Sequence, residues 1–156
     1  MKSRACNKHI PLCLVPLLIG LSGCGGVYES SVSGIVTLDS TPITRGTVTF
    51  KPANSGPSAY GQIGQNGEYE LRTGREIGIP PGQYLVTVVA NEPPPLKQTA
   101  SGGPPPPGPP ITPAWYRSPD LSGLTFNVEP GSNDINLELT TQPPAGWQDP
   151  AKRRRR

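Results

Sequence analysis

The sequence predicts an all-β protein: a single immunoglobulin-like or transthyretin-like β-sandwich of about seven strands with a proline-rich insertion. Apolar and polar residues alternate over short runs rich in β-branched residues, and glycine and proline separate these runs. No stretch carries a convincing helical periodicity. Ten of the 22 prolines lie in residues 92–113. This uneven distribution indicates a folded domain with a proline-rich loop rather than a disordered chain.

Strand-like runs precede the insertion, and each is bounded by turn residues. They are Val32–Leu38, Gly46–Lys51, Ala59–Ile63, Glu68–Arg72 and Gln83–Ala90. In the second run the alternation places Val48 and Phe50 toward the core. The last run is the most apolar, and it places Tyr84, Val86 and Val88 on one face. These inward side chains are sufficient for a small sandwich core.

Turn signals connect these runs. Asp39-Ser40-Thr41-Pro42 ends the first run. Asn66-Gly67, at the end of the connection Gly64–Gly67, predicts a hairpin, because both residues tolerate positive φ. Pro81-Gly82 predicts a type II turn with Gly82 at the positive-φ position.

Two further strands are expected after the insertion, at Leu124–Glu129 and Ile135–Thr140, joined by a turn at Pro130–Asn133. The sandwich is therefore expected to span residues 32–141. Residues 142–156 form a tail with a basic terminus.

The N-terminal segment has the pattern of an export signal. A basic start precedes an apolar run, Ile10–Leu21, that is too short to span a bilayer. Leu21, Ser22, Gly23 and Cys24 follow at its end. This tetrapeptide resembles the lipobox of bacterial lipoproteins.

The lipobox resemblance implies cleavage before Cys24 and attachment of lipid, such as palmitate, to its sulfur and new amino terminus. Residues 1–23 are then the signal peptide and residues 24–31 a lipidated tether. Two or three acyl chains anchor a protein permanently to a membrane. Gly25 after the cysteine favours the outer over the inner membrane if two membranes are present. Cys6 and Cys13 leave with the signal, so no disulfide forms within the mature chain.

The formal charge of +3 comes from the two ends of the chain. The signal and the terminal run 152–156 hold eight of the 14 cations, which leaves six against 11 acids, or about −5, for the body. Such a body has no broad attraction for nucleic acid. The basic terminal run is expected to be solvated, and contact with anionic lipid or wall polymers stays open.

Three segments carry a shared strand-and-turn pattern: Ser33–Asp39 with Gly46–Phe50, Asn66–Leu71, and Pro81–Val88. They resemble carboxypeptidase regulatory-like domains, and Ile111–Leu124 resembles a segment of the small planctomycete-type lipoproteins that bear this domain. The resemblance implies a non-catalytic accessory β-domain without cofactor or metal. The chain departs from the family pattern at Ser40, which replaces a turn glycine, at Gln65-Asn66, which replaces an acidic pair, and at Trp115, which stands where lysine is common.

The residue inventory argues against an enzyme. The single histidine, His9, lies in the signal, so the mature chain has no catalytic triad and no histidine-based zinc site. A carboxylate pair drawn from Asp120, Glu129 and Asp134 is the remaining catalytic arrangement. These acids are expected at strand ends and in turns, where they face solvent.

Three aromatic residues are candidate ligand contacts: Trp115, Tyr116 and Trp147. They could stack against sugar rings, but the favoured interpretation is that Trp115 and Tyr116 fix the insertion to the sandwich and Trp147 covers an edge. The prolines of the insertion favour polyproline II, which suits either a stiff loop or docking into a partner's groove.

The sequence therefore predicts a non-catalytic, membrane-anchored lipoprotein of the cell envelope. Its sandwich is expected to act as a structural or protein-interaction module. The alternative is a module that binds carbohydrate or cell wall through exposed aromatics. The partner, an envelope protein or a glycan, is not specified by the sequence.

Overall fold

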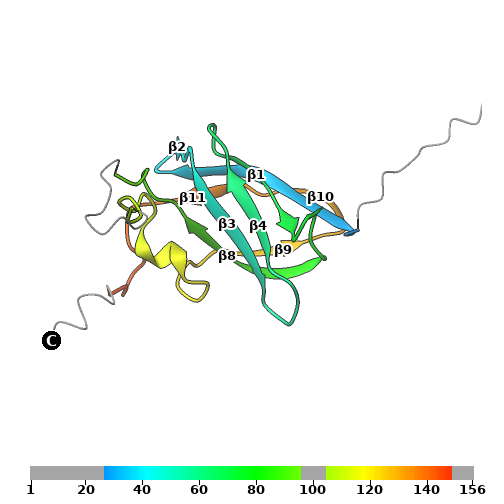
Figure 1. The fold of residues 1–156 in the computed structure, drawn as a ribbon. Coiled ribbons are helices and arrows are strands. Elements are labelled where there is room, and N and C mark those ends of the chain that lie inside the picture. The colour runs from blue at the N-terminus through cyan, green and yellow to red at the C-terminus, as the bar shows by residue number, and fades with distance from the viewer. Residues whose placement is uncertain (1–26, 96–104, 149–156) are drawn as a thin grey trace, which may run out of the picture.

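A computed structural model describes residues 27–95 and 105–148. It consists of two packed β-sheets with one short 3₁₀ helix, η1 (Ala114–Arg117), and confirms the predicted all-β sandwich (Figure 1). Within these residues, no helix is long and apolar enough to cross a membrane. The signal peptide, the lipobox, residues 96–104 and the basic run 152–156 lie outside the described residues.

The first sheet is built around β1 (Ser30–Leu38), which is bordered on both sides. On one side it pairs antiparallel with β5 (Glu68–Glu70) and β2 (Thr41–Pro42). On the other side it pairs in parallel with β10 (Gly131–Asp134) and β11 (Leu137–Leu139). The first and last strands of the sandwich therefore lie side by side and run in the same direction.

The second sheet has the strand order β7-β6-β4-β3-β8-β9. Its members are β3 (Gly46–Pro52), β4 (Ala59–Ile63), β6 (Arg72–Thr73), β7 (Glu76–Ile77), β8 (Gly82–Val89) and β9 (Thr125–Val128). All of its pairings are antiparallel. The predicted faces of β3 and β8 are confirmed, because Val48, Phe50, Tyr84, Val86 and Val88 are buried.

One continuous segment, residues 68–73, belongs to both sheets. Its first part, β5, pairs with β1, and its second part, β6, pairs with β4. Leu71 lies between the two parts, is fully buried, and donates its N–H to the Val32 carbonyl at 2.9 Å. A break at residues 135–136, here called the bend, separates β10 from β11, but both of these strands pair with β1. If β5–β6 and β10–β11 are each counted as one strand, the sandwich has seven longer strands, as predicted. Strands β2 and β7 are two-residue additions.

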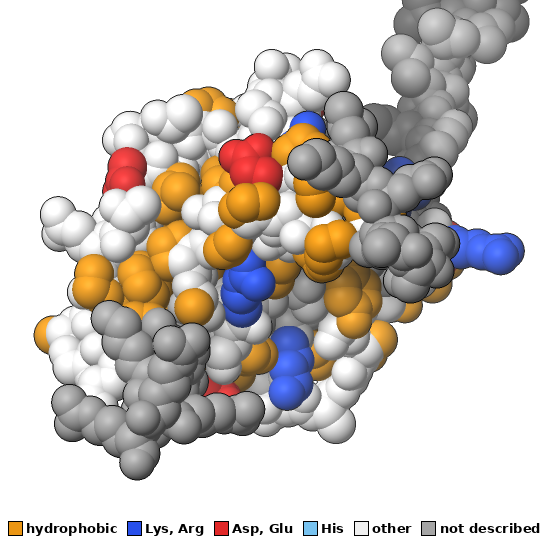
Figure 2. Space-filling view, turned by 60° about the vertical axis from the view of Figure 1, so that its left-hand side comes forward, with side chains coloured by type: hydrophobic (Ala, Val, Ile, Leu, Met, Phe, Trp, Pro, Cys, Tyr) orange, Lys and Arg blue, Asp and Glu red, His pale blue; other side chains and the backbone are white. Residues whose placement is uncertain are grey.

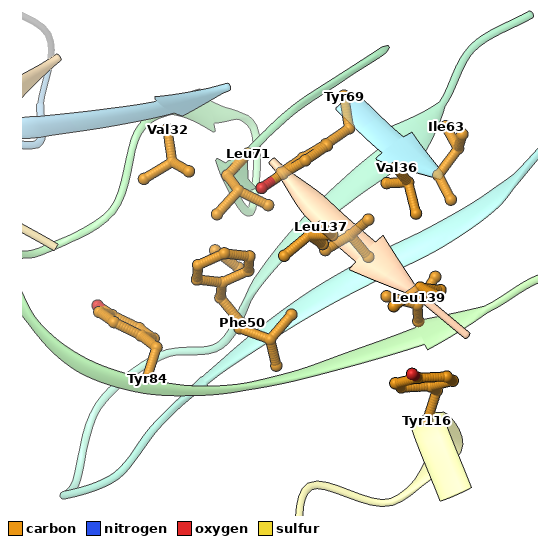
Figure 3. Close-up of a cluster of buried hydrophobic side chains, with 14 of the residues drawn as sticks. Val32, Val36, Phe50, Ile63, Tyr69, Leu71, Tyr84, Tyr116, Leu137 and Leu139 are labelled. Atoms are coloured by element: carbon orange, nitrogen blue, oxygen red, sulfur yellow. The ribbon is translucent and has the colours of Figure 1, made fainter. Parts of the chain in front are cut away.

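The core lies between the sheets and is centred on Phe50 (Figure 3). The ring of Phe50 lies 6.0 Å from Tyr84, 6.3 Å from Phe126 and 6.4 Å from Tyr69, measured between centroids. The hydroxyl of Tyr69 donates to the Ile135 carbonyl at 2.7 Å and so ties β5 to the bend between β10 and β11. The central aromatic group thus contacts both layers.

Two of the predicted turns differ from the structure. Pro130–Asn133 was expected to be a turn, but Gly131–Asp134 forms strand β10 because it pairs in parallel with Ser30–Ser33. Asn133 directs the chain into this strand. Its side-chain oxygen accepts from the Glu129 N–H at 2.9 Å, and its amide donates to the carbonyls of Glu129 and Ser31. At Pro81-Gly82 the predicted positive φ of Gly82 is confirmed, at +144°, but Gly82 already pairs with Val128 as the first residue of β8, so the predicted type II turn is wrong.

The hairpin signals are confirmed in position but not in detail. At Asn66-Gly67 only Gly67 has positive φ, +86°, and its N–H donates to the Gly64 carbonyl at 3.1 Å. This is a type I turn followed by a glycine bulge rather than a two-residue turn. The break after β1 is itself a tight hairpin, in which Asp39 and Ser40 have φ +47° and +67°.

Candidate functional site

The sandwich has two ends with different structures. The Ser30 end holds the start of β1 and the starts of β8 and β10, and the described chain begins there. The opposite end, here the insertion end, holds the far ends of β1, β8 and β11, both stems of the proline-rich insertion, and η1 (Figure 1). The described chain also leaves the sandwich at the insertion end, after Leu139.

The stems of the insertion extend β8 as a narrow ladder. Asn91 and Pro110 form an antiparallel bridge, and the N–H of Glu92 donates to the Pro109 carbonyl at 2.8 Å. Gly108 packs against this ladder so closely that an added Cβ would lie 2.5 Å from the Pro93 carbonyl oxygen. The prolines of the insertion therefore project from a hydrogen-bonded base.

Thr112 joins the returning stem to the sheet. Its side chain is 1% exposed, and its hydroxyl accepts from the Ala90 N–H at 3.1 Å and donates to the Val88 carbonyl at 3.2 Å. The Ile111 N–H donates to the Ala90 carbonyl at 2.9 Å. These bonds hold η1, which follows Pro113, against the end of β8.

The structure brings Trp115, Tyr116 and Trp147 together into one cluster. The Trp115 ring lies 4.9 Å from Trp147 in an edge-to-face arrangement and 5.8 Å from Tyr116, measured between centroids. Trp115 and Tyr116 are 6% and 5% exposed, and Trp147 is half-buried. The Tyr116 hydroxyl accepts from the Thr140 N–H at 3.0 Å. The rings face one another and the core, which matches the packing role favoured from the sequence; stacking of sugar on Trp115 and Tyr116 would first require the cluster to open.

The three candidate acids lie in different settings. Asp120 follows η1, Asp134 lies on β10 beside Ser33, and Glu129 precedes β10, where its carboxylate contacts the Asn127 amide. Across residues 27–95 and 105–148, no group of three or more His, Cys, Asp or Glu side chains is arranged to hold a metal ion.

A further feature was not anticipated from the sequence: a hollow on the outer face of the second sheet, with a volume of about 430 Å³. It is lined by Thr47, Tyr60, Gly61, Gln62, Glu70, Arg72 and Gly74. Tyr60 is 54% exposed there, whereas Tyr69, Tyr84 and Tyr116 are at most 5% exposed. The sequence signal that could have indicated this hollow is the run Ala59–Ile63, in which the inward positions are apolar or glycine and Tyr60 occupies an outward position.

No protein-family model, curated protein or solved structure matches this chain.

Proposed function

We propose that this chain is a non-catalytic lipoprotein of the cell envelope, anchored through lipid on Cys24, with the outer membrane favoured over the inner where two membranes are present. Its sandwich presents the insertion end to a partner protein. The observation that carries the proposal is that the Ser30 end and the insertion end lie on opposite sides of the sandwich. The chain enters the sandwich at the Ser30 end, while the proline-rich stems and η1 lie at the other (Figure 1). The family resemblance to carboxypeptidase regulatory-like domains supports the same role.

The length of the tether decides which end would face the membrane. Cys24 precedes Ser30 by six residues. A fully extended chain of that length spans at most about 20 Å, so lipid on Cys24 would keep the Ser30 end near the bilayer. The nine residues of β1 then place the insertion end about 30 Å farther out. The sandwich acts as a spacer in this arrangement.

The insertion end has features that suit protein docking. Polyproline segments are extended in advance, so they lose little conformational entropy when a partner binds. Their base is held by the buried Thr112 and by the Tyr116–Thr140 hydrogen bond. Figure 2 shows hydrophobic side chains spread across this part of the surface, separated by individual basic and acidic side chains. Such a mixed surface resembles non-obligate protein interfaces.

The anchoring step is tested with a Cys24→Ser variant expressed in a bacterium that processes lipoproteins. We expect the wild-type protein to fractionate with membranes and to have a mass that exceeds the chain from Cys24 onward by the attached lipid. The variant should lose both properties. Membrane association of the variant equal to that of the wild type would contradict lipid anchoring.

The docking step is tested by chemical cross-linking in intact cells, followed by purification and mass spectrometry. In the test variant an Asn-Gly turn replaces residues 94–107; the turn is short enough because Gly108 packs against Pro93. The matched control carries substitutions at Asn54 and Ser55, which lie in the β3–β4 loop. We expect a cross-linked partner with the wild type and the control but not with the test variant. A cross-linked partner retained by the test variant would refute docking through the insertion.

A further inference from the structure

The hollow around Tyr60 lies on the side of the sandwich, away from both ends, and the proposed docking role does not use it. The strand register shows how it is built. Tyr60 on β4 lies directly between Thr49 on β3 and Arg72 on β6. In the next row Gln62 lies opposite Thr47, and the Gln62 amide donates to the Thr47 hydroxyl at 3.4 Å. The hollow therefore places one aromatic ring among hydroxyl, amide and guanidinium groups.

The charges of the hollow are balanced. Arg72 and Glu70 form an ion pair at 3.4 Å, and their side chains are 51% and 49% exposed. A free cation would favour an anionic ligand, but this pair offers donors and acceptors without net charge. Both side chains are about half-exposed, so their other hydrogen-bonding positions remain accessible to a ligand.

From this chemistry we infer that the Tyr60 hollow is a binding site for a neutral pyranose chain. The C–H face of a pyranose ring stacks on an aromatic face, while its equatorial hydroxyls need the amide, carboxylate and guanidinium partners that surround Tyr60. The volume of about 430 Å³ falls within the range of small-ligand sites, about 300–1,000 Å³. The hollow lies on the open outer face of the sheet, so an extended β-1,4-linked chain can continue beyond it, which a compact ligand does not need.

A protein partner fits the hollow less well. Protein interfaces place several aromatic or aliphatic anchors in a well-packed centre and bury about 800 Å² on each side. Here Tyr60 is the only aromatic lining residue, and polar groups border it. Ile77, which is 46% exposed, lies opposite Arg72 on β7, so the position of Arg72 separates it from Tyr60 in the same row. The observations therefore favour a saccharide.

The inference also differs from glycan binding through Trp115, Tyr116 and Trp147. Those rings are packed against one another at the insertion end, whereas Tyr60 is already exposed and needs no rearrangement. Binding at Tyr60 would place the glycan along the flank of the sandwich. The two sites can be separated by single substitutions.

The test is co-sedimentation of the full-length protein, purified in detergent, with three neutral β-1,4-linked polymers: cellulose, chitin and mannan. We expect saturable binding to at least one polymer. Tyr60→Ala should weaken it about three- to tenfold, the effect of losing one aromatic stack, and Tyr60→Phe should preserve most of it. Gln62→Ala, which leaves the ring in place, should weaken binding to a smaller extent.

The matched control is Ile35→Ala. Ile35 is 45% exposed on the other sheet, so this variant removes a comparable apolar surface away from the hollow and should bind like the wild type. Unchanged unfolding midpoints of the variants will show that they are folded. Failure of the wild type to bind all three polymers, or equal binding by Tyr60→Ala, would overturn the inference. An equal loss with Ile35→Ala would indicate non-specific adsorption and would overturn it as well.

Discussion

Gly34 on β1 should not tolerate alanine, although its position in a strand suggests otherwise. Replacing glycine by alanine at a compatible position usually stabilises a protein by about 0.4–1 kcal/mol, because the unfolded chain loses freedom. Gly34 is not among the residues with positive φ, so its backbone alone does not require glycine. The constraint comes from the bend between β10 and β11. A Cβ on Gly34 would lie 2.6 Å from the Ile135 carbonyl carbon and closer still to its oxygen.

The size of the effect follows from what must move. The Ile135–Asn136 backbone would have to separate from β1. This displacement disrupts three hydrogen bonds: Ile135 N–H to the Ser33 carbonyl at 2.8 Å, Ile35 N–H to Asn136 Oδ1 at 2.8 Å, and Tyr69 hydroxyl to the Ile135 carbonyl at 2.7 Å. Overpacking costs about 1–3 kcal/mol, and each weakened hydrogen bond adds about 0.5–1.5 kcal/mol. With three such bonds, we therefore expect Gly34→Ala to lower the free energy of unfolding by about 2.5–7.5 kcal/mol.

The assay is equilibrium unfolding in urea, followed by tryptophan fluorescence, since Trp115 and Trp147 pack together in the folded state. Gly64→Ala is the matched control. The three atoms nearest to a Cβ at Gly64 all belong to the Glu68 side chain, which can rotate away with the loss of one exposed hydrogen bond from the Asn66 N–H, so the midpoint should change far less than for Gly34→Ala. A midpoint for Gly34→Ala that is equal to or higher than that of the wild type, with an unchanged slope, would refute the close approach of the two strands.

Three further predictions concern the hairpin after β1 and the core tyrosine. Ser40 has φ +67°, so Ser40→Gly should relieve the strain of the left-handed backbone and raise the free energy of unfolding by about 0.5–1 kcal/mol, measured by urea denaturation. A lower free energy of unfolding would contradict the turn geometry. Hydrogen bonds from the Thr141 hydroxyl and N–H hold the pKa of Asp39 below its ordinary 3.8. These bonds should therefore contribute to folding stability above pH 3.8, and this contribution should be lost as the pH falls through the lowered pKa. Thr141→Val should raise this pKa in an NMR titration, and an unchanged pKa would show that the hydroxyl contact is absent. Burial, with a smaller effect of the Asp134 charge, raises the pKa of Tyr69, so the free energy of unfolding should fall as the pH rises above about 10. Tyr69→Phe should lessen this fall and should cost about 1 kcal/mol of stability at neutral pH, because the hydrogen bond to Ile135 is lost. A variant whose stability falls at alkaline pH as the wild type's does would contradict the assignment.

Alternation predicted the strands best where both faces have a constant environment. For β3 it gave the inward residues Val48 and Phe50 correctly, because this strand has its core side on one face throughout. The alternation did not predict the change of sheet within residues 68–73, because Tyr69 before the transfer and Leu71 at the transfer both point inward. Which neighbour a strand pairs with is a tertiary property that local periodicity does not contain.

Turn residues were misleading where a distant strand supplied the hydrogen bonds. Pro130–Asn133 has the composition of a turn, but β1 lies alongside and accepts Gly131–Asp134 as a parallel neighbour. The aromatic residues show the complementary case. The packing role of Trp115 and Tyr116 could be inferred from residue type, while the hollow around Tyr60 depends on Thr47 and Arg72, which come from the neighbouring strands β3 and β6.

The parallel pairing of β1 with β10 and β11 has a mechanical consequence. The chain enters at the Ser30 end and leaves after Leu139 at the opposite end, so tension between the two exits pulls these neighbouring strands in opposite directions along their length. The registered pairs Ser30–Ser33 with Gly131–Asp134 and Val36–Leu38 with Leu137–Leu139 would then bear the load together, in shear, instead of opening one after another. A sandwich connected in this way should resist extension far better than a hairpin peeled from one end.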